Sequence, residues 1–186
     1  MTIDEAVQSA HTADVWLFRG HTVADRAIRM LTNAPVNHVA MVVALDDLPP
    51  LLWHTELGQS LESVWTGKYR QRAFVRHFDG EITSEAEDNL LRVIAEYEGR
   101  AFPRTRHLAA KWLAGRLKRE ASERAVYCAE LLAITYTRMG LLDPRTPANW
   151  FDPGRFWSGD RLELAGGASL GPEIAVTGSV LPAGAS

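Results

Sequence analysis

The sequence predicts an α+β fold in which a small antiparallel sheet, or barrel, packs against helices. Two short apolar segments separated by a single turn predict a hairpin of neighbouring antiparallel strands. Later segments have the apolar spacing of amphipathic helices, and strands and helices do not alternate as a series of βαβ units would require. The chain has 186 residues, 46% of them hydrophobic, which is enough for one domain with its own core.

The predicted strands are short apolar segments that end at glycine or at polar turn residues. The first segment, DVWLFRG, ends at Gly20, and the hairpin turn contains two aspartates and two prolines. The strands are expected at 14–20, 36–45, 51–57, 72–78, 161–165 and 172–176, with the hairpin turn at 46–50 and a loop at 58–60.

The predicted helices follow capping residues and have apolar residues at helical spacing. Thr22 can cap the first helix, and Thr83 or Ser84 the second. Gly99 and Gly140 are expected to end two of the helices. The helices are expected at 21–33, 83–100, 102–120 and 128–140.

The chain is predicted to be a single domain, residues 1–186. Its core is expected at about residues 14–142. Residues 143–186 are expected to hold an aromatic loop (NWFDPGRFW, 149–157), the two short strands and a loose tail from 178.

Composition argues against several classes of protein. The net charge of −3 does not fit a nucleic-acid-binding protein, which normally presents a basic face. No secretory signal and no stretch of about 20 apolar residues is visible, so we expect a cytoplasmic protein without a transmembrane segment. A single cysteine excludes an internal disulfide and a cysteine-based zinc site, and we expect no cofactor. The oligomeric state stays open.

The single cysteine, Cys128, stands where a predicted helix begins. Backbone N–H groups and the helix dipole at such a position favour the thiolate, which is the nucleophilic form of cysteine. The alternative is that Cys128 is a small buried apolar residue of the core.

Two histidines are placed where they could assist a thiol. His38 begins an apolar strand, where a polar ring needs a partner, and His54 lies in the next strand of the hairpin. An even spacing from the turn predicts that both rings lie on one face. A metal site is the competing interpretation, with Glu56 or Asp14 as a third ligand. The other histidines, His11, His21, His77 and His107, are expected to be surface or capping residues.

The segments ADVWLFRG, IRMLTNAPVNHVAMVV, LLWHTE and YCAELLAITYTRMGLL, in this order, resemble a known family. They are similar to the circularly permuted branch of the NlpC/P60 papain-like superfamily, in particular the permuted papain-like amidases of the YiiX/YebB type. Lecithin retinol acyltransferase is a more distant relative. The resemblance covers about residues 14–142, with two departures: Ala13 replaces a glycine, and Ala129 replaces a serine.

The resemblance implies a permuted papain-like fold and a cysteine hydrolase or amidase. We expect no metal, because the two histidines lack an obvious third ligand unless Glu56 or Asp14 serves. Cys128 would attack a carbonyl carbon and form a thioester, and His38 would take and return the proton. His54, or Glu56 if the register slips, would orient His38, and the backbone N–H of Cys128 would stabilise the oxyanion.

The substrate is expected to be a small molecule, a peptide-like amide, or a lipid or acyl ester. Tyr127, Trp53, Trp65 and the aromatic loop could line an apolar substrate groove, and the alternative is that these aromatics belong to the core. Two other functions stay open: an acyltransferase, in which the thioester passes to an amine or alcohol, and a catalytically inactive binding module of the same fold.

Overall fold

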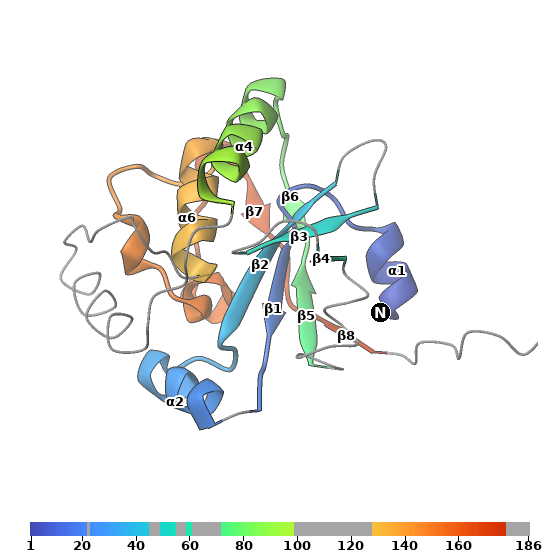
Figure 1. Ribbon diagram of the computed structural model, residues 1–186, viewed down its shortest axis with the longest axis vertical. Coiled ribbons are helices and arrows are strands. Elements are labelled where there is room, and N and C mark those ends of the chain that lie inside the picture. Colours follow the sequence, from blue (N-terminus) through green and yellow to red (C-terminus); the bar gives the residue numbers. More distant parts are fainter. Residues whose placement is uncertain (22, 45–48, 55–58, 61–71, 99–127, 178–186) are drawn as a thin grey trace, which may run out of the picture.

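The computed structural model describes residues 1–21, 23–44, 49–54, 59–60, 72–98 and 128–177. Its centre is a six-stranded sheet with the order β4-β3-β2-β1-β5-β8, in which every neighbouring pair is antiparallel (Figure 1). The strands of this sheet are β1 Val15–Phe18, β2 His38–Val43, β3 Leu51–Trp53, β4 Gln59–Ser60, β5 Ala73–Arg76 and β8 Ile174–Val176. A small second sheet pairs β6 Phe78–Asp79 with β7 Ser169–Leu170. The predicted α+β class with an antiparallel sheet is confirmed.

The predicted hairpin forms between β2 and β3. Met41 pairs with Trp53, and Val43 pairs with Leu51. On its other side β2 pairs with β1, whose four residues are all buried. A strand that is buried on both faces needs cover from both sides of the sheet, and helices supply it.

The helices in the described part of the chain are α1 Ile3–Gln8, α2 Val23–Thr32, α4 Ser84–Tyr97 and α6 Cys128–Arg138. As predicted, Thr83 caps α4, because its hydroxyl accepts a hydrogen bond from the Ala86 backbone N–H (3.2 Å). Gly140, at φ 78°, follows the end of α6. In the described residues, no helix has both the length and the apolar character required to cross a bilayer.

Alternation along the strands divides the core into two clusters. Val39, Met41 and Val43 pack under α4 and α6, whereas Ala40 and Val42 pack on the side of α1. Figure 1 shows α4 and α6 on one side of the sheet and α1 on the other.

Several expectations need correction. Residues 161–165 do not form a strand: a short 3₁₀ turn, Ala165–Gly167, contains two glycines at positive φ, and the strand β7 comes after it. The expected loop at 58–60 contains β4, which pairs with β3. The helix α1 was not predicted, although Thr2 and Glu5 form a capping box. The predicted helix at 102–120, Gly99 and the tail from 178 lie outside the described residues.

Candidate active site

The two predicted histidines lie side by side. The ring centroids of His38 and His54 are 5.2 Å apart, and the ring planes meet at 80°. His38 is the first residue of β2, and His54 follows the last residue of β3. Continuing the register from Met41–Trp53 places His54 opposite Ala40, two residues from His38 on the same face. The prediction that both rings share one face of the hairpin is therefore confirmed.

Cys128 packs in the core cluster that lies under α4 and α6. It is buried (5% exposed) and belongs to the cluster that contains Val39 and Met41. The ring of His38 lies 5.7 Å from the ring of Phe18, which belongs to the cluster on the α1 side. A thiol–imidazole pair would therefore form at the end of the sheet where α6 and β2 have their first described residues.

Hydrogen bonds fix which ends of α6 and β2 lie together. The indole N–H of Trp53 donates to the Thr135 hydroxyl (3.0 Å), so Thr135 lies level with Met41, the strand partner of Trp53. Cys128 precedes Thr135 by seven residues, about 10 Å along a helix. His38 precedes Met41 by three residues, about 10 Å along a strand.

The direction of α6 comes from a second bond. The Tyr136 hydroxyl donates to the carbonyl of Ala13, which lies beside Val42 towards the other end of β2. Burial raises the pKa of this phenol far above its ordinary value, and the nearby Asp14 carboxylate adds to the increase. The first residue of α6 and the first residue of β2 therefore lie at the same end of the sheet.

A buried polar network holds the chain just before His38. The Asn37 side-chain oxygen accepts from the Gly20 backbone N–H (2.7 Å), and its amide donates to Asp25 Oδ1 (2.9 Å). Arg29 donates to the Gly20 carbonyl (2.7 Å). A Cβ on residue 20 would lie 2.2 Å from Asp25 Oδ2, which explains the glycine. The sequence does not predict this network, although Asn37 lies in one of the segments that carry the family resemblance.

Asp14 is fully buried at the opposite end of the sheet. Its carboxylate accepts hydrogen bonds from the backbone N–H groups of His11 (3.0 Å) and Phe78 (2.8 Å), and it lies 3.0 Å from Nδ1 of His77. Asp14 is therefore committed to His77 and is not available to the His38–His54 pair as a third metal ligand. The expectation that His77 is a surface or capping residue needs correction, since its side chain is partly buried against this carboxylate.

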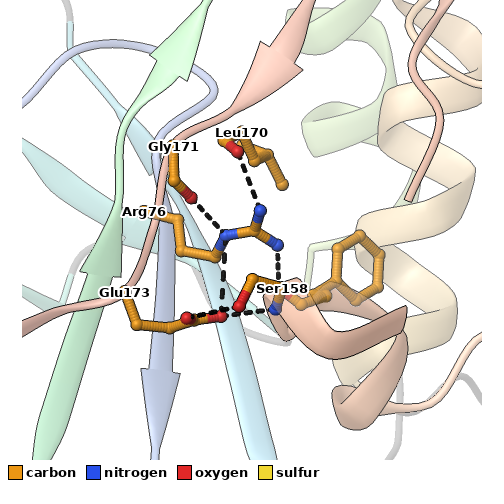
Figure 2. Close-up of polar contacts among 6 residues, drawn as sticks. Arg76, Ser158, Leu170, Gly171 and Glu173 are labelled. Carbon is orange, nitrogen blue, oxygen red and sulfur yellow. Dashed lines mark hydrogen bonds and ion pairs between the residues drawn. The ribbon is translucent and has the colours of Figure 1, made fainter. Parts of the chain in front are cut away.

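Buried Arg76 fixes the C-terminal segment and the aromatic loop to the sheet (Figure 2). Its guanidinium donates to three carbonyls, those of Phe156 (2.6 Å), Leu170 (2.8 Å) and Gly171 (2.6 Å). Glu173 lies 3.8 Å from Nε, and it also accepts from the backbone N–H and the hydroxyl of Ser158. Burial lowers the pKa of Arg76, and the Glu173 charge opposes that change.

The aromatic residues proposed for a substrate groove have different surroundings. Trp53 is 1% exposed, and Phe151 and Phe156 are buried in the same core cluster. These three aromatic side chains therefore belong to the core and do not line a groove. Trp150 is half-buried, with the Arg155 guanidinium 3.8 Å from its ring centroid. Tyr127, Trp65 and Glu56 lie outside the described residues.

A pocket of about 410 Å³ lies between the turn that leads into β2 and the aromatic loop. Thr32 and Pro35 line one side, and Asp152 and Arg155 line the other. Gly154 allows these walls to approach, because a Cβ there would lie 2.7 Å from that of Ala34. Pro35, in the wall of this pocket, lies three residues before His38 along the chain.

The arrangement is that of an antiparallel α+β domain with two histidines and one cysteine at one end of its sheet. No protein-family model matches the sequence. No curated protein matches it either. Among solved structures, the chain is similar to metalloprotein yiiX (DUF1105) from Escherichia coli O157:H7, with a TM-score of 0.53 and 17% identity. The match covers 70% of this chain and 66% of that chain, slightly under two thirds of its length.

At this level of identity the likeness concerns the fold. It agrees with the resemblance to the YiiX type and with an antiparallel sheet packed against helices. The name of that protein describes it as a metalloprotein. In the described part of the present chain, no group of three or more His, Cys, Asp or Glu side chains is placed to hold a metal ion.

Proposed function

We propose that this chain is a cysteine hydrolase that cleaves a peptide-like amide or an acyl ester. The observation that supports the proposal is the contact between the His38 and His54 rings, 5.2 Å apart, at the end of the sheet where Cys128 begins α6. A thiol, an imidazole and a second polar group that orients the imidazole are the parts of a thiol-hydrolase site.

In the proposed reaction His38 takes the proton of Cys128, and the thiolate attacks the substrate carbonyl carbon. The backbone N–H of Cys128 stabilises the oxyanion of the tetrahedral intermediate. The intermediate collapses to a thioester, and the leaving amine or alcohol takes the proton from His38. His38 then removes a proton from water, and the hydroxide attacks the thioester, which releases the carboxylic acid and restores the thiol.

His54 is proposed as a positioning residue. Its ring meets that of His38 nearly edge-on, at 80°, so it can hold one orientation of the His38 imidazole. The buried Asn37, fixed by Gly20 and Asp25, restrains the backbone immediately before His38. Preorganisation of this kind keeps a base within reach of its thiol.

The test is the rate of iodoacetamide labelling as a function of pH, followed by intact mass. The chain has one cysteine, so every adduct reports on Cys128. Because this thiol is only 5% exposed, the absolute rate also depends on access, whereas the pH midpoint does not. The wild type is compared with His38→Ala, His54→Ala and the matched control His21→Ala, which removes an exposed histidine.

The proposal predicts a wild-type midpoint well below the value of about 8.5 for an ordinary thiol. His38→Ala should move the midpoint to that ordinary value, His54→Ala should move it part of the way, and His21→Ala should leave it unchanged. An ordinary midpoint that is identical in all four proteins would refute the thiolate–imidazolium pair.

A further inference from the structure

Polar side chains connect helix α2 to the rest of the chain in the part of the helix whose side chains the structure describes. Asp25 is 6% exposed and bonded to Asn37, and the half-buried Arg29 donates to the Gly20 carbonyl. A surface helix ordinarily turns its apolar residues towards the core. Among the α2 side chains that the structure describes, those that contact the body of the protein are polar.

The apolar side chains described on α2 face solvent. Val23 is 84% exposed and Met30 is 82% exposed, and exposed Ala27 lies between them at helical spacing. One other large hydrophobic side chain is exposed in the described residues, Leu91 on α4, at 46%. In Figure 1, α2 projects beyond the end of the sheet where β1 ends and β2 begins, away from α1, α4 and α6.

Exposed positive charges lie on α2 and next to its first turn. Arg19 and Arg26 are exposed, and so is Arg72, whose carbonyl accepts from the Arg19 N–H (3.0 Å). The one acidic residue between residues 15 and 44 is Asp25, which is buried. This local excess of positive charge occurs in a chain of net charge −3.

We propose that this face of α2, formed by Val23, Ala27 and Met30 with Arg19 and Arg26, docks the protein on an anionic lipid bilayer. Apolar side chains would enter the interfacial region, and the guanidinium groups would contact lipid phosphates. A second copy of the chain fits the face less well, because a twofold contact would bring the arginines of both copies together.

Docking would turn one end of the sheet towards the lipid. The last residue of α2, Thr32, is followed six residues later by His38, so the bilayer would lie next to the candidate active site. The docking proposal is nevertheless independent of the proposed chemistry, because it concerns binding and is measured without a substrate.

The test is co-sedimentation of the full chain with two kinds of vesicle. One is phosphatidylcholine alone, and the other contains about 30% phosphatidylglycerol. The variants are V23S/M30S, which removes the exposed apolar side chains, and R19E/R26E, which reverses the charge. L91S is the matched control, since it removes an exposed apolar side chain elsewhere. All substituted side chains are solvent-exposed, and circular dichroism checks that each variant is folded.

We expect the wild type to bind the anionic vesicles and not the neutral ones, and about 0.5 M NaCl to weaken binding. V23S/M30S and R19E/R26E should each reduce binding about tenfold or more, and L91S should bind like the wild type. Absence of wild-type binding, equal binding to both vesicles, or wild-type binding by V23S/M30S would overturn the proposal. So would a wild-type dimer that V23S/M30S converts to a monomer, because it would assign the face to a second copy.

Discussion

Replacement of Arg76 by methionine should destabilise the fold by about 3 kcal/mol. Methionine fills most of the same volume but has no hydrogen-bond donor. The substitution leaves the carbonyls of Phe156, Leu170 and Gly171 without the donors that now lie at 2.6–2.8 Å. It also removes the cation that lies 3.8 Å from Glu173, whose side chain is 11% exposed.

The magnitude follows from opposing contributions. A buried acceptor that loses its donor costs about 1–3 kcal/mol, and three are affected. The loss is partly offset because a buried guanidinium no longer has to be desolvated, a cost that is visible in its lowered pKa. Relaxation of the C-terminal segment, which can let water reach Leu170 and Gly171, limits the total to the lower part of the range.

The assay is urea unfolding followed by tryptophan fluorescence, with Arg145→Met as the control. Arg145 also binds a carboxylate, that of Asp143, but its side chain is 88% exposed, so we expect a much smaller change than for Arg76→Met. Arg76→Lys keeps the charge but has a single nitrogen in place of the planar fork, and its stability should lie between the wild type and Arg76→Met. A value for Arg76→Met within about 1 kcal/mol of Arg145→Met would refute this reasoning.

Three further predictions concern single contacts. Trp53→Phe removes the indole N–H that donates to Thr135 and holds α6 on the sheet, and should lower the free energy of unfolding in urea by about 2 kcal/mol. Trp157→Phe, at a half-buried ring, should lower it by less than half as much. Gly20→Ala places a Cβ 2.2 Å from Asp25 Oδ2 and should lower the free energy of unfolding by about 2 kcal/mol. Gly159→Ala places a Cβ 3.6 Å from the nearest atom of Trp157 and should change stability little. Equal effects of the two substitutions would contradict the close approach at Gly20. Hydrogen bonds from Arg145 lower the pKa of Asp143 from 3.8 to about 2. Any stability that this pair contributes is therefore present above the ordinary carboxyl pKa and is lost as the pH falls towards 2. An NMR titration of Asp143 should show this midpoint, and the midpoint should return towards the ordinary carboxyl pKa in Arg145→Gln.

The parts of the site that could be predicted depend on local sequence patterns. A turn between two apolar segments predicts the β2–β3 hairpin, and a period of two predicts that His38 and His54 share a face. The helix that carries Cys128 follows from apolar spacing and from Gly140. Each of these features is determined by residues that are close together in the sequence.

The parts that could not be predicted depend on long-range packing. Arg76 binds carbonyls 80 to 95 residues away, and Asp14 binds His77, 63 residues away. A single sequence shows that these residues are charged, but it does not show which distant groups they meet. The same limit applies to Cys128: alternation places both histidines together, but only the packing of α6 shows which core cluster Cys128 joins.

The apolar core and the two histidines occupy different parts of the sheet. The middle of the sheet is held by apolar packing, with Leu17, Met41 and Val43 at most 1% exposed. His38 and His54 lie beyond it, half-buried at the ends of their strands, and Asn37 holds the backbone next to His38. Removal of either ring should therefore cost less stability than truncation of a core side chain, because both rings lie at the edge of the packed apolar middle. A change in the labelling profile of these variants would then report on the chemistry of Cys128 and not on unfolding.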